Sequence, residues 1–196
     1  MAVAVRPAEL TDAGAIATAH IASWQSGYED LIADEVLRAL GSRLLERTLR
    51  WQTIILGAEA EGHFVLVGEI DGELAGFLTG GACRDDREEP LGEVHGCYVD
   101  PAHWRKGVGS ALMATAIERL TQAGHSEAVL WVLAGNLRAR AFYEAHGWVA
   151  DGAEKTYDLE GGRYPEVRYR RNLGKLRGQG LSCEEAPAPR QEGGPH

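Results

Sequence analysis

The stretch CYVDPAHWRKGVGSALM, residues 97–113, contains the features that decide the fold. It ends an apolar run, passes through Asp-Pro, and places Gly107 and Gly109 directly before an apolar helical pattern. Proline halts sheet pairing, so we expect a strand over residues 93–99 and a helix over residues 107–124. The N-terminus of a helix carries unpaired N–H groups and partial positive charge, which attract phosphate. The stretch therefore predicts a strand, a phosphate-binding loop and a helix.

The side chains of this loop agree with a phosphate site. Arg105 and Lys106 add positive charge, Ser110 can add a hydroxyl donor, and the glycines let a ligand approach the backbone closely. The segment lacks the G-x-x-x-x-G-K-[ST] pattern of a Walker A loop and the third glycine of a dinucleotide-binding fingerprint. We therefore expect a different phosphate-bearing cofactor.

The rest of the chain is divided between helical and extended patterns. The first quarter is helical after a short extended start, and two β-rich runs then flank Asp71-Gly72, the pair that suits a two-residue hairpin turn. These runs should therefore pair as antiparallel strands. Helices are expected over residues 13–24, 107–124 and 136–147, and a helical stretch over residues 34–52, within which Ser42 could cap a new helix. Strands are expected over residues 3–5, 63–70, 73–79, 93–99, 128–133, 154–159 and 165–171.

Composition limits the classes of protein to consider. The chain has 196 residues, a length that suits one domain, here residues 1–173, followed by a tail over residues 174–196 that we expect to be disordered. The formal net charge of -9 argues against a general nucleic-acid binder. No apolar run approaches the roughly 20 residues that span a bilayer, so we expect no membrane association. The three cysteines show no C-x-x-C spacing, which predicts neither disulfides nor a metal site and suits the cytoplasm.

Two segments, residues 97–113 and NLRARAFYEAHGW at residues 136–148, resemble the GNAT superfamily of acyl-CoA-dependent N-acyltransferases. The resemblance extends over about residues 3–173 and implies an α/β (α+β) fold, with a mixed, mainly antiparallel sheet and helices on both faces. It also implies acetyl-CoA as cofactor, lying along the strand with its pyrophosphate on the loop amides. One departure is Trp104, where the family usually has Gln or Arg. The cofactor-binding residues implied are Cys97, Tyr98, Val99, Trp104, Arg105, Lys106, Gly107, Val108, Gly109, Ser110, Asn136 and Tyr143.

Acyl transfer to an amine requires a proton acceptor, a donor to the developing oxyanion and a proton for the leaving thiolate. Strand alternation predicts that Glu93, His95, Cys97 and Val99 lie on one face. We expect Glu93 to be the base, acting through water, with His95 as the alternative. The competing interpretation is that Glu93 is a solvated strand-end residue and His95 a packing residue.

Further roles are implied by the resemblance. Tyr143 would protonate the thiolate, and a phenol with a pKa near about 10 is protonated at neutral pH. Asn136 suits a helix cap and would also contact the pantetheine arm. Cys97 is interpreted as a small hydrophobe whose backbone N–H faces the thioester carbonyl. Trp24 and Tyr28 would roof the acceptor site, although Trp24 is also in register with the apolar stripe of its helix.

The sequence therefore predicts transfer of acetyl from acetyl-CoA to a primary amine by direct attack in a ternary complex. The amine belongs to a small molecule or a peptide. The alternatives are an acyl-CoA-binding regulatory module without catalysis, and a protein N-terminal or lysine acetyltransferase. Members of the family often form homodimers, although no feature of this sequence requires one.

Overall fold

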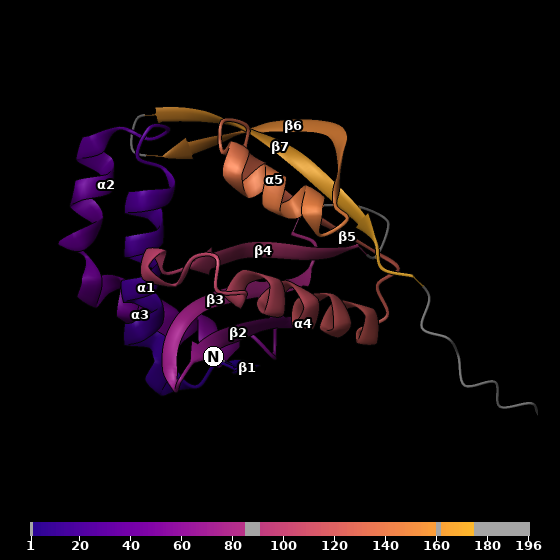
Figure 1. Ribbon diagram of the computed structural model, residues 1–196, viewed down its shortest axis with the longest axis horizontal. Helices are drawn as coiled ribbons and strands as arrows, with labels where there is room; N and C mark the ends of the chain where they lie inside the picture. Colours follow the sequence, from indigo (N-terminus) through magenta and orange to yellow (C-terminus); the bar gives the residue numbers. More distant parts are fainter. Residues whose placement is uncertain (1, 85–90, 160–161, 175–196) are drawn as a thin grey trace, which may run out of the picture.

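A computed structural model describes residues 2–84, 91–159 and 162–174 of the chain. Its centre is a seven-stranded sheet in the order β1-β2-β3-β4-β5-β7-β6 (Figure 1). Neighbouring strands are antiparallel except β4 and β5, which are parallel, so the mixed, mainly antiparallel sheet is confirmed. The strands are β1 (Val3–Pro7), β2 (His63–Ile70), β3 (Glu73–Ala82), β4 (Gly92–Val99), β5 (Glu127–Leu133), β6 (Val149–Leu159) and β7 (Gly162–Asn172).

Helices cover both faces of this sheet, as predicted. On one face α4 buries Leu112, Ala116 and Leu120, which recur every four residues and have no exposed surface. On the other face Ile16 of α1 and Trp51 of α3 pack against Phe77 of β3. The helices are α1 (Ala13–Gly27), α2 (Asp34–Gly41), α3 (Leu44–Gly57), α4 (Val108–Gln122) and α5 (Leu137–Ala145), with short 3-10 turns at Leu10–Asp12 and Pro101–His103.

The turn between β2 and β3 is the predicted hairpin. Asp71 and Gly72 both have positive φ, 51° and 85°, as a two-residue turn that follows strand twist requires. The hairpin places β3 between β2 and β4, so that the strand with the candidate site residues lies in the middle of the sheet.

Two strands are longer than predicted, because glycines that interrupt the β-rich sequence pattern lie inside the strands of the structure. Residues from Gly80 onward were expected to form a loop, yet β3 continues to Ala82. A Cβ on Gly80 would lie 2.7 Å from the Phe64 ring, so glycine here permits close packing. Similarly, β6 begins at Val149 because Gly152, with φ 84°, forms part of an irregularity inside the strand.

Two predicted features fall outside the description. Residues 85–90, between the strands expected over residues 73–79 and 93–99, and residues 175–196 of the expected tail lie outside the described residues. In the part of the chain that the structure describes, none of the helices combines the length and the apolar character needed to cross a bilayer.

Candidate active site

Strands β4 and β5 separate partway along their length. Their parallel pairing joins residues 92–94 to residues 128–130 and stops there, although both strands continue. A cavity of about 1440 Å³ is lined by residues from both strands and from the helices on both faces of the sheet. Single-ligand pockets usually measure roughly 300–1,000 Å³, so this cavity has room for a cofactor and an acceptor together.

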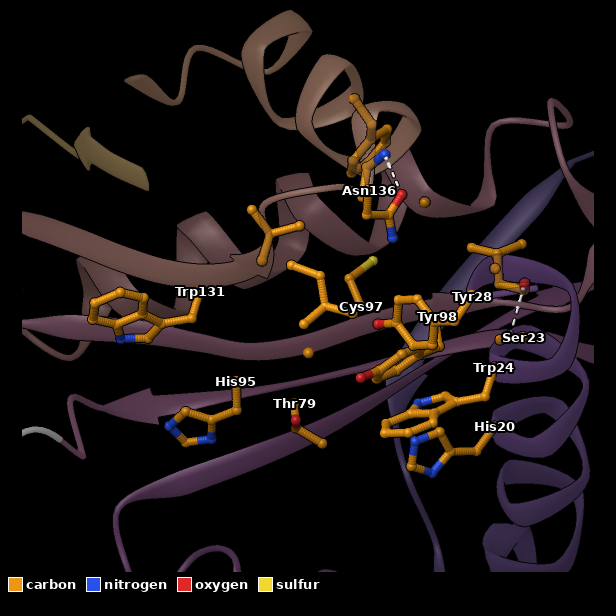
Figure 2. Close-up of a pocket in the computed structure, with 18 of the residues that line it drawn as sticks. His20, Ser23, Trp24, Tyr28, Thr79, His95, Cys97, Tyr98, Trp131 and Asn136 are labelled. Carbon is orange, nitrogen blue, oxygen red and sulfur yellow. Dashed lines mark hydrogen bonds between the residues drawn. The ribbon is translucent and has the colours of Figure 1, made fainter. Parts of the chain in front are cut away.

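A bulge in β4 divides this cavity between the two faces. Gly96 pairs with Thr79 while Val94 pairs with Gly80, which leaves His95 as an extra residue. Cys97 therefore packs on the α4 side together with Val94, only three positions earlier. Figure 2 shows the Cys97 sulfur pointing towards Asn136, with His95 on the opposite side of the strand.

The prediction that Glu93, His95, Cys97 and Val99 share one face is therefore wrong. Alternation holds only in an unbroken strand, and the extra residue exchanges the faces beyond it. His95 lines a small pocket with Trp51 and Ile54 of α3, and Glu93 lies beside His95. Cys97 and Val99 instead belong to the cluster beneath α4. The candidate base and the cofactor-facing residues thus reach the cavity from opposite sides of the sheet.

Glu93 is a buried carboxylate held by one arginine. Its side chain is 2% exposed, and its Oε1 accepts from Nη2 of Arg84 at 2.5 Å. Its Oε2 accepts from the backbone N–H of Arg84 at 2.9 Å. Burial opposes ionisation, but the Arg84 hydrogen bonds and charge outweigh it and lower the pKa of Glu93. Glu93 is therefore ionised at neutral pH and is neither solvated nor weakly held.

His95 is a neutral imidazole beside this ion pair. Its Nε2 donates to the carbonyl oxygen of Ala82 at 3.2 Å and lies 3.9 Å from Oε2 of Glu93. In that tautomer Nδ1 carries the lone pair. Burial, followed by the charge of Arg84, lowers the pKa of His95 to about 4.

A second buried histidine lies where α1 meets β4. The ring of His20 contacts four aromatic rings, and neither ring nitrogen has a hydrogen-bond partner among the described residues. Burial, with the charges of Arg47 and Arg50, lowers the pKa of His20 to about 3.

These two histidines should make the fold sensitive to acid. Their pKa values in the unfolded chain are near about 6.5, so below that pH the unfolded state binds more protons and stability falls. Each should remove about 1.4 kcal/mol per pH unit between its unfolded and folded pKa values. Urea unfolding at several pH values between neutrality and the folded pKa values should show this loss, and His20→Phe should remove one histidine's share of the slope. An unchanged slope in the variant would contradict the assignment.

The loop before α4 presents a row of unpaired backbone donors. Within the described residues, none of the N–H groups from Arg105 to Ser110 donates to a backbone carbonyl, and the first helical bond runs from Ala111 to Gly107. Gly107 has φ 87° and Arg105 has φ 62°, which turns the chain sharply at this point. The loop therefore presents a cluster of free N–H donors of the kind that can bind a diphosphate.

The other loop residues have packing roles. A Cβ on Gly109 would lie 3.3 Å from the Phe142 ring, so glycine at this position allows α5 to pack closely against the start of α4. The Ser110 hydroxyl is bonded to Nε2 of His146 at 3.0 Å, a partner that sequence reasoning did not foresee. Trp104 donates through Nε1 to the carbonyl of Val99 at 2.8 Å, and the Arg138 guanidinium lies 3.6 Å from its ring centroid. The departure at Trp104 therefore closes the loop onto the end of β4.

Tyr143 is buried and Cys97 is half-buried, and both line the cavity. Tyr143 is 7% exposed and lines the cavity, and burial raises the pKa of its phenol further above the ordinary value. Burial also raises the pKa of the Cys97 thiol to about 12, which makes a thiolate nucleophile unfavourable. The interpretation of Cys97 as a small hydrophobe agrees with this environment.

Asn136 is the N-cap of α5, as predicted. Its Oδ1 accepts from the backbone N–H of Ala139 at 3.0 Å, and its side chain is buried at the cavity wall.

We expect Asn136→Ala to lower the free energy of unfolding by about 0.5–2 kcal/mol, because an N–H of α5 loses its partner. Asn136→Asp retains a capping oxygen and should lose less. Urea denaturation measures both, and equal losses would argue against the cap.

The cavity wall beside α1 and α3 combines predicted and unpredicted residues. Trp24 is 8% exposed and Tyr28 is half-buried, with their rings 5.0 Å apart, and both line the cavity. Sequence reasoning missed Arg84, Arg47 and Arg50, which also line it. The available signal was the three-residue spacing of Arg47 and Arg50, which places them on one helix face.

Comparisons with known proteins agree with this geometry. The family model described as Acetyltransferase (GNAT) family matches residues 24–148. The uncharacterized N-acetyltransferase YuaI of Bacillus subtilis (strain 168) is 33% identical over 165 residues, which cover 84% of this chain and 90% of YuaI.

Two solved structures share the fold. The PaiA N-acetyltransferase from Thermoplasma acidophilum, in complex with coenzyme A, has a TM-score of 0.67 and 18% identity and covers 88% of this chain and 99% of its own. YncA from Salmonella typhimurium, with its cofactor acetyl-CoA, has a TM-score of 0.62 and 20% identity and covers 91% of this chain and 98% of its own.

Proposed function

Because this chain belongs to the acetyltransferase (GNAT) family and is an acetyl-CoA-dependent N-acetyltransferase, we propose that it transfers acetyl directly to a primary amine in a ternary complex. One observation carries the proposal. The row of unpaired N–H groups before α4 and the buried Glu93–His95 pair line the same large cavity, from opposite faces of the sheet. An arrangement of this kind can hold cofactor and acceptor together, with the reacting groups meeting at the gap between β4 and β5.

The loop and the edge of β4 hold the cofactor. The N–H groups from Arg105 to Ser110 bind its pyrophosphate, and Asn136 contacts its pantetheine arm. Acetyl-CoA supplies the activated thioester. Because β4 pairs with β5 only as far as Val94, backbone groups on that edge are available beyond it, and we assign the Cys97 N–H to the thioester carbonyl.

His95 receives the proton from the amine, directly or through water. Glu93, favoured by the sequence, has a lowered pKa because Arg84 holds its carboxylate, which makes it the weaker base. Its negative charge, 3.9 Å from Nε2 of His95, instead stabilises the imidazolium that forms. Glu93 and His95 therefore act as a pair, with the proton held on the imidazole.

Tyr143 donates to the leaving sulfur. Its phenol remains protonated at neutral pH, and it lines the cavity near Cys97. The same burial makes a departing thiolate more basic, so proton transfer from the phenol becomes favourable as the bond breaks. Trp24 and Tyr28 contribute the wall against which the acceptor lies.

The test is free-thiol release from acetyl-CoA with a panel of small amines and peptides, together with mass spectrometry of the products. Amine-dependent release with an acetylated amine as product supports the proposal. Binding of acetyl-CoA with no turnover on any acceptor would indicate the regulatory module instead. Turnover confined to peptides would indicate a protein acetyltransferase, and absence of cofactor binding would overturn the assigned cradle.

A further inference from the structure

Helix α3 presents arginines to the acceptor end of the cavity. Arg47 and Arg50 lie one turn apart on the helix and both line the cavity, next to Trp51 and Ile54. Arg47 is half-buried, and its Nε is shielded from solvent without a hydrogen-bond partner among the described residues. A guanidinium N–H buried in this way is costly unless a ligand accepts from it.

The acidic side chains that line the cavity have other cationic partners. Glu93 pairs with Arg84 at 2.5 Å, and Glu166 pairs with Lys155 at 3.8 Å. Asp158 pairs with Arg163 at 3.2 Å. Within residues 2–84, 91–159 and 162–174, no ion pair joins an acidic side chain to Arg47 or Arg50. The chain has a net charge of -9, yet Arg47 and Arg50 line this cavity without an ion-pair partner among the described residues.

Neighbouring groups report the same excess of positive charge. Burial, then the charges of Arg50 and Arg43, lower the pKa of Arg47. The same two charges, Arg47 and Arg50, act on His20 of α1 and on Tyr157 of β6. Three separate elements thus surround a region of positive potential, which stabilises bound anions.

We propose that the acceptor amine carries an anionic group, a carboxylate or a phosphate, which Arg47 and Arg50 bind. The inference rests on the proposed function, because the amine of the same molecule must reach His95. Guanidinium groups match carboxylate and phosphate oxygens with paired N–H donors, so they fix the orientation of the acceptor as well as its affinity. The acceptor class is therefore a small amino acid or amino phosphate.

Pairs of acceptors that share an amine but differ in the anionic group test the contribution of that group. Alanine is compared with ethylamine for the carboxylate, and O-phosphoethanolamine with ethanolamine for the phosphate. The variants are Arg47→Gln and Arg50→Gln. Arg38→Gln is the control, because Arg38 is 73% exposed, pairs with Asp34 at 3.8 Å and does not line the cavity.

We expect the wild-type protein to prefer the charged member of at least one pair. Each of the two cavity variants should raise the KM of that charged acceptor by about 10- to 100-fold, as loss of a charge-assisted hydrogen bond does. The KM of acetyl-CoA and the kinetics with the neutral amine should change little. The Arg38→Gln protein should match the wild type, and the preferred pair identifies carboxylate or phosphate.

A binding measurement keeps the inference separate from catalysis. Calorimetry of alanine and O-phosphoethanolamine, titrated into protein saturated with coenzyme A, should show binding that Arg47→Gln weakens. Such binding without turnover of any amine would contradict the proposed function and support the anion site. Turnover of neutral amines without any preference for charge, unaffected by both cavity variants, would overturn the anion site and retain the function.

Discussion

Replacement of Tyr143 by phenylalanine is expected to lower kcat for acetyl transfer by about 100- to 1,000-fold, because general-acid catalysis contributes on this scale. The phenol is buried at the cavity wall and its raised pKa keeps the proton in place until the thiolate develops. Phenylalanine preserves the packing of the ring against Phe142, 5.5 Å away, so the loss should lie in the chemical step. Steady-state kinetics at saturating acetyl-CoA measure it.

Tyr164→Phe is the matched control. Tyr164 is a tyrosine of β7 whose side chain does not line the large cavity. This variant should keep kcat within about two-fold of the wild type, since it removes a hydroxyl that lies outside the cavity and keeps the ring. If Tyr143→Phe behaves in the same way, with coenzyme A affinity unchanged in both, the thiolate leaves without a proton from Tyr143.

Substitution of His95 by glutamine should lower kcat/KM for the acceptor by about 100- to 10,000-fold, the range for loss of a general base. Glutamine can still donate to the carbonyl of Ala82, which the imidazole now does at 3.2 Å, but it has no basic nitrogen. The affinity for acetyl-CoA, measured by calorimetry, should be unchanged because the cradle before α4 is on the other side of the sheet.

Two further variants decide between the members of the acid–base pair. His63 is a neighbouring histidine whose ring lies 4.8 Å from the His95 ring, and His63 does not line the large cavity. His63→Gln should therefore have little effect on turnover. Glu93→Gln should lower kcat/KM less than His95→Gln, because it removes a stabilising charge and leaves the base. A greater loss in Glu93→Gln would identify the carboxylate as the base, as the sequence alone suggested.

Local features were predictable because they depend on neighbouring residues. The hairpin at Asp71-Gly72 follows from positive φ values that few residue pairs accept, and the helix from Gly107 follows from a four-residue apolar repeat. Asn136 was identified as a cap because its side chain reaches only the next turn. The resemblance to a known family supplied the mixed, mainly antiparallel character of the sheet and the cofactor.

Features that depend on contacts between distant segments were not predictable in this way. The bulge at His95 arises from the pairing of β4 with β3, and the alternating pattern of residues 93–99 does not indicate it. The ion pair of Glu93 with Arg84 reverses the expected chemistry, because hydrogen bonds from a segment nine positions away lower the carboxylate pKa. Strand alternation therefore gave the wrong face for two of the four residues.

The helices and strands, the glycine-containing loop before α4 and the groups that can carry protons could be read from the sequence, since each is a property of a residue and its near neighbours. The tertiary structure alone decided which face of the sheet each group meets and which charges are neutralised. Those outcomes depend on long-range packing: Arg47 and Arg50 line the cavity because α3 packs beside α1 on one face of the sheet, and their charges act on Tyr157 of β6. The effects of charge and burial on a pKa depend on distances in the folded chain, so they can be assigned only when the tertiary structure is known.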